Sequence, residues 1–375
     1  MATLQYLTTT HFDFGALEKL KPTLGQLGVS RPMIATDAGL VSTGIVDTVR
    51  GAMEGLEVTV FDGTPENPTE EAVREAAQLY RDAGCDGIVA LGGGSPMDLG
   101  KGVALAVTHE GPLAQYAAME GGKVGPVAPL VAVPTTAGTG SEVSVGAVII
   151  CEDGRKLTFA GPSLIPKVAI CDPELTLGLP PRLTAATGMD AMTHCIEALL
   201  SPIVNPPAEA IALDGIERGL GRGHLERAVA DGSDRDARWN MMMASTEGAL
   251  SFIKGLGAVH AMSHAAGRLK ELRLHHGTLN AVCLPHVLRY NADHVGGKFG
   301  RIRKAAGLAP DTDLADYIAE LNARIGLPGS LGEMGVTRDM MPGLVENAVG
   351  DLANLTNPRK CGPEDYETLF DRAIG

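Results

Sequence analysis

The sequence lacks the features of membrane-spanning and secreted proteins. Its longest apolar runs, around residues 127–134 and 145–151, are far too short to cross a bilayer. The first five residues, Met-Ala-Thr-Leu-Gln, lack the basic and then apolar pattern of a signal peptide. We therefore expect no targeting segment and no membrane partner.

Clustered cysteines and clustered basic residues are also missing. The six cysteines are scattered, with no C-x-x-C pair and no spacing typical of a disulfide framework or a zinc ribbon. Reduced thiols in a cytoplasmic protein fit this pattern best. The net charge is −14 and no Lys/Arg cluster is visible, which argues against a nucleic-acid partner.

What the sequence does contain is typical of a globular α/β protein. Hydrophobic residues make up 45% and charged residues 20% of the chain, while aromatic residues are only 4% and there are 48 glycines. At 375 residues the chain is too long for one compact core and suits two domains of ordinary size.

The first half alternates β-branched runs with helical stretches, which predicts a parallel sheet with covering helices. A helix is expected from Pro68 to about Ala83, with Asn67 as its N-cap and Glu70 at its third position. The turn at residues 152–154 favours an antiparallel edge formed by the last two strands. The predicted strands cover residues 32–36, 56–61, 87–91, 131–134, 143–151 and 168–171.

Two glycine-rich turns follow predicted strands, at residues 92–96 and 135–141. The first does not match the Walker A pattern, and it also fails G-x-G-x-x-G because Met97 occupies the last position. A tight turn without a ligand would explain either one alone. Two such turns after adjacent parallel strands would lie at one carboxyl edge, where open α/β folds bind nucleotides.

Helical periodicity dominates the second half, as at residues 208–218, 237–252 and 341–355. We place the boundary in the proline-marked segment at 179–181 and just after it. The predicted fold class is α/β, with a Rossmann-like parallel-sheet nucleotide domain at 1–182 and an all-helical metal- and substrate-binding domain at 183–375.

Metal-competent side chains recur at helical spacing in the second half. Asp190 and His194 are four residues apart, as are His260 and His264, and His276 follows. A helix places such pairs on one face, one turn apart. A single buried histidine is more often a core residue, but this combination predicts a site made of Asp190, His194, His260 and His276. Three imidazoles and one carboxylate suit Fe²⁺ or Zn²⁺, with a position open for substrate. His264 would then act outside the ligand set, in proton handling.

The chain resembles the iron-containing, or group III, alcohol dehydrogenase family over essentially its whole length. The motifs that carry this resemblance are Phe14-Gly15, Thr36-Asp37, Asn67-Pro68-Thr69, Gly92-Gly-Gly-Ser-Pro-x-Asp98, Pro134-Thr-Thr-Ala-Gly-Thr-Gly-Ser-Glu142, Gly188-x-Asp190-Ala-x-x-His194, His260-Ala-x-x-His264, His276-Gly277-x-x-Asn280-Ala281, Leu284-Pro285 and Asn357-Pro358-Arg359.

The resemblance implies roles for matching residues. The four metal-competent residues would hold the metal, and His264 would lie beside nicotinamide and substrate. The remaining positions would bind the cofactor: Gly93, Gly94, Ser95 and Asp98 at the pyrophosphate, Thr135, Thr136 and Thr139 along the cofactor, Lys156 and Leu179 toward the ribose or nicotinamide, and Asn67 at the adenosine.

The resemblance also implies an NAD-linked alcohol dehydrogenase or aldehyde reductase that contains Fe²⁺, with Zn²⁺ as the alternative. Asp37 matches the position that accepts the adenosine ribose hydroxyls. Because a carboxylate there would repel a 2′-phosphate, NAD is predicted over NADP. The metal would act as a Lewis acid while hydride passes to or from the nicotinamide. A homodimer or higher homo-oligomer is expected.

Departures from the family pattern concern the substrate. Ser251 to Lys254 replaces a common Phe-x-Asn, Gly146 and Ala353 are small, and the longer segment 268–273 adds positive charge. The simplest interpretation is that these cations are solvated. The alternative hypothesis is an enlarged pocket for a polar or anionic aldehyde, such as an ω-carboxy, sulfo or phosphono aldehyde.

Other functions remain open from the sequence. A glycerol-dehydrogenase-like polyol oxidase or a dehydroquinate-synthase-like lyase would share the nucleotide domain. A cofactor-free metallohydrolase could use three histidines and an aspartate, although it would have no use for Asp37 and two glycine turns. A non-catalytic metal-binding protein would leave the nucleotide domain unexplained.

Overall fold

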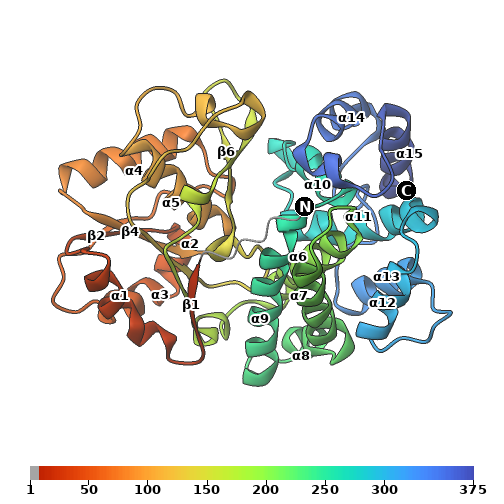
Figure 1. Cartoon of the computed structure of the whole chain (residues 1–375), viewed down its shortest axis with the longest axis horizontal. Coiled ribbons are helices and arrows are strands. Elements are labelled where there is room, and N and C mark those ends of the chain that lie inside the picture. Colours follow the sequence, from red (N-terminus) through yellow and green to blue (C-terminus); the bar gives the residue numbers. More distant parts are fainter. Residues whose placement is uncertain (1–7) are drawn as a thin grey trace. The chain divides into compact units, whose positions relative to one another are not determined.

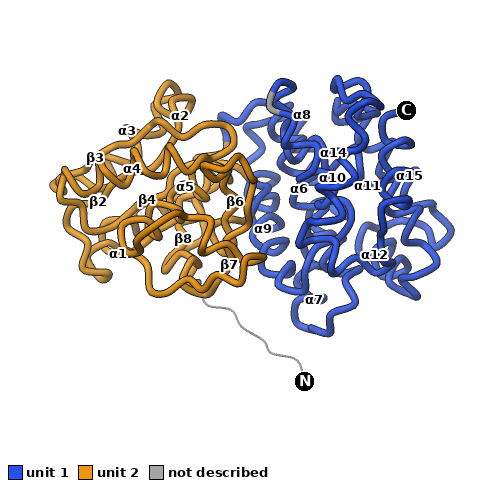
Figure 2. The backbone as a smooth tube through the Cα atoms, turned by 90° about the horizontal axis from the view of Figure 1, so that it is seen from above, with its two compact units in different colours: residues 1–4, 137–139, 177–375 blue, residues 5–136, 140–176 orange. Residues whose placement is uncertain are grey.

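The computed structural model describes residues 8–375, except for the side chain of Lys270. The expectation about the first five residues therefore lies outside the described part. The chain forms two compact units (Figure 2). The α/β unit, orange in Figure 2, extends to Thr176, apart from Ala137–Thr139. These three residues belong with the helical unit, Leu177–Gly375, which is blue. The division into functional domains at 1–182 and 183–375 stays our proposal.

The α/β unit contains a parallel six-stranded sheet in the order β1-β8-β5-β4-β2-β3, and a separate two-stranded antiparallel sheet. The strands are β1 Thr9–Phe12, β2 Pro32–Ala35, β3 Thr59–Phe61, β4 Gly87–Gly92, β5 Leu130–Pro134, β6 Gly146–Ile150, β7 Lys156–Ala160 and β8 Val168–Cys171. The α-helices of this unit are α1 Leu20–Gln26, α2 Ala38–Ser42, α3 Ile45–Gly51, α4 Glu70–Asp82 and α5 Gly94–Ala106.

Both faces of the parallel sheet are buried. In β4, Ile88 and Ala90 belong to one hydrophobic core, while Val89 and Leu91 belong to another on the opposite face. Successive side chains of a strand point to opposite faces, so a strand covered on both sides is apolar throughout. This is the reason for the uninterrupted apolar runs in the sequence, and it confirms the predicted parallel-sheet fold class.

The carboxyl ends of β2, β4 and β5 lie side by side, because β4 pairs with both of the other strands. Asp37 follows β2, Gly93 follows β4 and Thr135 follows β5, with the Thr135 amide donating to the Gly92 carbonyl at 3.0 Å. The two glycine turns therefore lie at one sheet edge, as predicted. The chain order reverses between β2 and β4, the position at which open α/β sheets form a ligand crevice.

Two local predictions are wrong. β8 joins the parallel sheet between β1 and β5, and the antiparallel partner of β6 is β7. The turn at residues 152–154 thus joins β6 to a strand that was not predicted. Helix α4 begins at Glu70, with Thr69 as its N-cap accepting from the Ala72 amide at 3.2 Å. Asn67 instead accepts from Lys156 Nζ at 2.9 Å.

The other unit is helical, and it is drawn from green to blue in Figure 1. Its α-helices are α6 Pro181–Leu200, α7 Pro206–Ile216, α8 His224–Ala230, α9 Arg235–Ser251, α10 Ala258–Ala266, α11 His276–Asn291, α12 Lys298–Ala305, α13 Leu314–Arg324, α14 Met341–Val349 and α15 Pro363–Ile374.

Helix α6 is the central helix of this unit. Every residue from Thr184 to Leu200 is buried, and α6 packs against α7, α9 and α11. A helix that is buried on all sides brings its polar side chains into the interior, where they need partners. Asp190 and His194 are two such side chains. Over residues 8–375, no helix combines the length and apolar character needed to span a membrane.

Candidate metal centre

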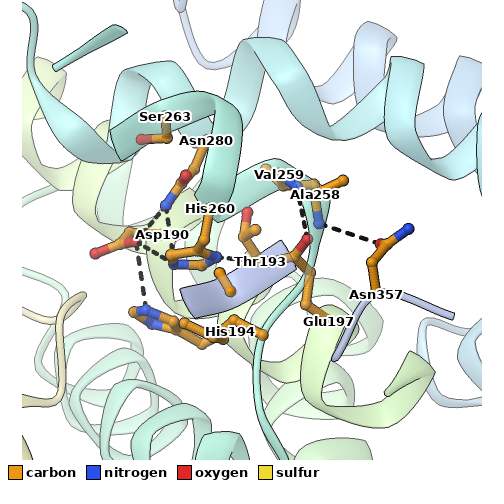
Figure 3. A network of polar contacts seen from close by, with 12 residues as sticks. Asp190, Thr193, His194, Glu197, Ala258, Val259, His260, Ser263, Asn280 and Asn357 are labelled. Atoms are coloured by element: carbon orange, nitrogen blue, oxygen red, sulfur yellow. Dashed lines mark hydrogen bonds and ion pairs between the residues drawn. The ribbon is translucent and has the colours of Figure 1, made fainter. Parts of the chain in front are cut away.

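Helices α6 and α10 bring three of the predicted ligands together. Asp190 and His194 project from one face of α6, and His260 projects from the first turns of α10 toward them (Figure 3). One donor atom from each of the three lies within 4.8 Å of the other two, and all three residues are buried. The helical spacing in the sequence thus becomes one cluster.

The imidazoles converge on a single carboxylate oxygen. The Nε2 atoms of His194, His260 and His276 lie 3.7, 3.9 and 3.6 Å from Asp190 Oδ1. These separations are too long for hydrogen bonds. Ligand atoms that each lie about 2.1 Å from one tetrahedral metal are about 3.4 Å apart. The distances therefore fit a shared divalent cation better than direct contacts between the side chains.

Gly277 allows His276 to approach this cluster. A Cβ atom at Gly277 would clash with the backbone carbonyl of Ala186 and would lie 3.2 Å from Asp190 Cβ. Because only glycine fits there, the first turn of α11 packs directly against α6. This close approach places the His276 ring at the edge of the cluster.

Glu197 orients His260. Its Oε2 atom lies 2.6 Å from His260 Nδ1, and its Oε1 atom accepts from the Val259 amide at 2.8 Å. A proton held on Nδ1 by this carboxylate leaves the Nε2 lone pair directed at Asp190. Burial lowers the pKa of His260 well below its ordinary range, and the nearby His194 adds to the effect. His260 is therefore a neutral imidazole, the form that binds metals.

The other two imidazoles are oriented in the same way. His194 Nδ1 lies 3.2 Å from the Gly138 carbonyl, and His276 Nδ1 lies 2.8 Å from Ser263 Oγ. Gly138 belongs to the short segment Ala137–Thr139 of the same unit. With every Nδ1 atom engaged, all three Nε2 atoms face the cluster.

The amide of Asn280 contacts three of the four predicted ligands. Its Nδ2 atom lies 2.7 Å from Asp190 Oδ1, 3.1 Å from His276 Nε2 and 3.3 Å from His260 Nε2. The amide NH₂ is a partially positive group, and lone pairs of three side chains are directed at it. The donor set thus fits a cation.

His264 stands beside the ligand set. Its ring stacks on His276 with centroids 5.2 Å apart, and its Nδ1 atom bonds to Asp351 Oδ2 at 2.9 Å. The carboxylate sets the orientation of the imidazole and leaves Nε2 for another partner. The role of His264 in proton handling stays a prediction.

The glycine turns in the α/β unit form a cradle suited to an anion. A Cβ atom at Gly93 would lie 3.3 Å from Thr136 Oγ1, a buried hydroxyl with no hydrogen-bond partner in the described structure. The 13-residue helix α5 begins at Gly94, and the N-terminus of a helix is suited to binding a phosphate. At the end of β2, Asp37 caps α2 by accepting from the Leu40 amide at 3.0 Å.

Other predicted cofactor residues support the turns. Ser95 Oγ donates to the Glu66 carbonyl at 2.5 Å, and Asp98 accepts from Ser141 Oγ at 2.8 Å and from the Val148 amide at 2.9 Å. Their contacts with a cofactor, like those of Asn67, Lys156, Thr135, Thr136 and Thr139, stay predictions.

Leu179 belongs to the helical unit, and its carbonyl accepts from Arg238 Nη2 at 3.0 Å. Its predicted contact with the cofactor stays a prediction.

Two residues singled out in the sequence are buried in the core of the helical unit. Ser251 Oγ donates to the Gly248 carbonyl at 2.7 Å. The side chain of Lys254 is fully buried, and its Nζ atom pairs with Glu209 Oε1 at 2.8 Å. Because this ammonium is already paired in the interior, Lys254 is not the group that would receive a substrate.

Several residues of the centre were missed in the sequence. Glu197 follows His194 by three positions and Asn280 follows His276 by four, so both lie on the ligand faces of their helices. That spacing was a usable signal. The contacts of Ser263 and of the Gly138 carbonyl depend on how separate segments pack, and no spacing in the sequence indicates them.

Replacing Glu197 with Gln tests its role in orienting His260. We expect the affinity for zinc or iron to fall about 10- to 100-fold, because an amide holds the Nδ1 proton less strongly than a carboxylate. Metal affinity is measured by competition with a chelator. Glu247→Gln, a change at another mostly buried glutamate in the same unit, serves as control and should leave metal affinity unchanged. Equal affinities in the Glu197 variant and the wild type would refute the role.

Comparisons with known proteins agree with this geometry. The model of the family described as "Iron-containing alcohol dehydrogenase" matches residues 8–173, and that described as "Fe-containing alcohol dehydrogenase family, C-terminal" matches residues 184–374. The chain is 53% identical to a 4-hydroxybutyrate dehydrogenase from Cupriavidus necator, with both chains covered over 100% of their length.

Two solved structures are similar over nearly the whole chain. A 1,3-propanediol oxidoreductase gives a TM-score of 0.93 at 38% identity, covering 99% of this chain and 100% of that one. A sulfoacetaldehyde reductase from Bifidobacterium kashiwanohense, in complex with NAD⁺, gives 0.90 at 28% identity, covering 100% and 99%. The chain therefore belongs to the iron-containing alcohol dehydrogenase family and is an oxidoreductase of the alcohol dehydrogenase type.

Proposed function

We propose that this protein is a metal-dependent, NAD-linked dehydrogenase that interconverts a short ω-hydroxy acid and the corresponding ω-carboxy aldehyde. The observation that carries the proposal is the convergence of three Nε2 atoms on Asp190 Oδ1 at 3.6–3.9 Å. The choice of substrate is supported by the 53% identity to a 4-hydroxybutyrate dehydrogenase. The choice of cofactor is supported by the similar reductase solved with NAD⁺.

Asp190, His194, His260 and His276 would hold the metal. Three imidazoles and one carboxylate suit Fe²⁺, with Zn²⁺ as the alternative. When bound, the metal supplies Lewis acidity at the carbonyl oxygen and the nicotinamide supplies or accepts the hydride. Glu197 and Ser263 keep the ligand imidazoles oriented throughout the reaction.

The residues around the centre would handle the proton. When an aldehyde is reduced, His264 Nε2 would donate a proton to the substrate oxygen, which becomes the hydroxyl of the alcohol. In the reverse direction, Nε2 would accept this proton. Asp351, bonded to His264 Nδ1, would stabilise the imidazolium that forms when Nε2 accepts a proton. The buried packing of α6, α10 and α11 would limit access of water to the reacting atoms.

The cofactor would bind along the carboxyl edge of the parallel sheet. The pyrophosphate would lie on the turn at Gly93–Ser95, close to the unpartnered Thr136 hydroxyl. Asp37 would accept the ribose hydroxyls and repel the 2′-phosphate of NADP.

Replacing Asp37 with Gly tests this assignment. We expect kcat/KM with NADPH to rise relative to that with NADH by roughly tenfold or more, because the repulsive charge is removed. The variant should fold, since glycine costs an N-cap only a few tenths of a kcal/mol. Asp37→Asn is the matched variant, which keeps the side-chain cap but removes the charge. An unchanged NADPH-to-NADH ratio in both variants would rule out the assignment.

The assembly and the compartment also belong to the proposal. We infer a homodimer or higher homo-oligomer, and multi-angle light scattering after gel filtration gives its mass directly. The six cysteines are free thiols in the structure, which supports a reducing compartment such as the cytoplasm.

A further inference from the structure

Arg268 follows His264 by four residues and lies just beyond the end of α10. His260, His264 and Arg268 follow one another at four-residue intervals. The helical turn continues past the end of α10, because the Arg268 amide donates to the Ala265 carbonyl at 3.3 Å. Each interval advances about 6 Å along the helix axis.

A chain of contacts connects this guanidinium to the centre. Arg268 Nη1 donates to Asn347 Oδ1 at 2.6 Å. Asn347 lies on α14, four residues before Asp351, which bonds to His264 Nδ1 at 2.9 Å. The His264 ring in turn stacks on His276. The same segment, Asn347–Asp351, thus holds both His264 and the half-buried Arg268.

The Arg268 side chain is half-buried, with the carboxylate of Asp351 nearby. Burial lowers the pKa of the Arg268 guanidinium despite the attraction of Asp351. The Asp351 carboxylate is engaged by His264 through one oxygen and by the Ala353 amide, at 2.8 Å, through the other. A half-buried cation is stabilised by a carboxylate that makes charge-assisted hydrogen bonds with it.

Two other cations whose side chains the structure describes, Lys254 and Arg273, do not offer the same group. Lys254 is buried and paired with Glu209. Arg273 is exposed. Among the non-glycine residues that the structure describes, it is the one with a positive φ, 47°. Ala353, two residues after Asp351, is buried and has a small side chain, so it adds little bulk there.

We propose that Arg268, held by Asn347, receives the carboxylate of the ω-carboxy aldehyde or ω-hydroxy acid whose reacting carbon lies at the histidine cluster. This inference rests on the proposed function. It makes Arg268 a specificity-determining residue, and it explains why a chain with an alcohol dehydrogenase centre would prefer an anionic substrate over a neutral one of similar length. The separation of about one helical turn suits a short, four-carbon substrate.

The test measures NADH oxidation with 4-oxobutanoate and with butanal, using metal-loaded wild type, Arg268→Met and Arg268→Lys. We expect Arg268→Met to lower kcat/KM for 4-oxobutanoate about ten- to a hundredfold more than kcat/KM for butanal, mainly through KM. Arg268→Lys should restore part of the difference, because it keeps the charge but not the planar fork. Arg273→Met, an exposed arginine from the same segment, is the matched control and should leave the ratio unchanged.

The outcomes separate the two proposals. A wild type that reduces neither aldehyde contradicts the proposed function and with it this inference. A wild type that reduces both, together with an Arg268→Met variant that keeps the wild-type ratio, contradicts only the assignment of Arg268. If Arg273→Met lowers the ratio of kcat/KM for 4-oxobutanoate to kcat/KM for butanal as much as Arg268→Met does, the assignment is also overturned. The preference would then reflect the charge of the whole segment. Circular dichroism and metal content show that each variant is folded and loaded.

Discussion

Replacing Asp190 with Asn is expected to abolish metal binding and, with it, aldehyde reduction. Asp190 Oδ1 is the point on which the three imidazoles converge, and its carboxylate supplies the negative charge of the predicted ligand set. We expect metal content to fall from near one ion per chain to less than about a tenth. Loss of several kcal/mol of Lewis-acid stabilisation predicts a fall in kcat/KM of about a thousandfold or more.

Metal-dependent stability gives a second measure of the same change. A ligand present at a hundred times its Kd stabilises the folded state by about 2.7 kcal/mol. Added zinc should therefore raise the Tm of the wild type but not that of Asp190→Asn. Asp214→Asn, a change at a partly exposed aspartate of α7, is the control and should keep metal content, activity and the shift in Tm. An Asp190→Asn protein with full metal content would contradict the proposed centre.

Replacing His264 with Ala is expected to separate proton handling from metal binding. The ring lies against His276 but is not among the residues whose Nε2 atoms converge on Asp190. Metal content should stay close to that of the wild type. Turnover should fall about a hundredfold, the lower range for removal of a general acid or base. The measurement is kcat from pH 6 to pH 9 at saturating NADH, with metal content determined on the same sample.

Two comparisons make this result specific. Free imidazole added to His264→Ala should restore part of the turnover, because it can occupy the space left by the ring. His294→Ala changes an exposed histidine and should behave as the wild type. Wild-type turnover of His264→Ala across the neutral range would show that His264 does not relay the proton. A loss of metal in this variant would assign it a structural role beside His276 instead.

Periodicity in the sequence was sufficient to predict much of the architecture. The parallel strands are apolar throughout because both sheet faces are buried, and such uninterrupted apolar runs can be recognised in the sequence itself. The antiparallel hairpin of β6 and β7 was harder to predict. Strand β7 has the sequence Lys-Leu-Thr-Phe-Ala, and only Phe159 in it is buried, so its hydrophobic signal is weak. The pairing of β8 with β1 and β5 depends on long-range register that local pattern does not encode.

Part of the metal centre was predictable from helical spacing. Asp190 and His194 on α6 follow the four-residue spacing of one helical face, and His260 on α10 has the same spacing from His264, which lies beside the ligand set. The orientation of their rings was not predictable, because the acceptors come from distant segments. The Gly138 carbonyl is 56 residues from His194, and Glu197 is 63 residues from His260.

An anionic substrate stays a proposal. From the sequence, the simplest interpretation of the cations at residues 268–273 was that they are solvated, and the anionic aldehyde was the alternative hypothesis. The structure adds the surroundings of two described cations, since Lys254 is paired in the core whereas Arg268 shares a segment with the partner of His264. Membership of the alcohol dehydrogenase family also removes the metallohydrolase alternative.

The most direct test of a metal-dependent reduction of an anionic aldehyde is NADH oxidation by the metal-free protein and by the same protein reloaded with iron or zinc, over a panel of aldehydes. We predict no activity without metal, activity restored by one of the two ions, and higher kcat/KM for 4-oxobutanoate than for butanal or other neutral aldehydes. Full activity in the metal-free protein would contradict the proposed centre. Clearly faster reduction of neutral aldehydes would contradict the proposed substrate.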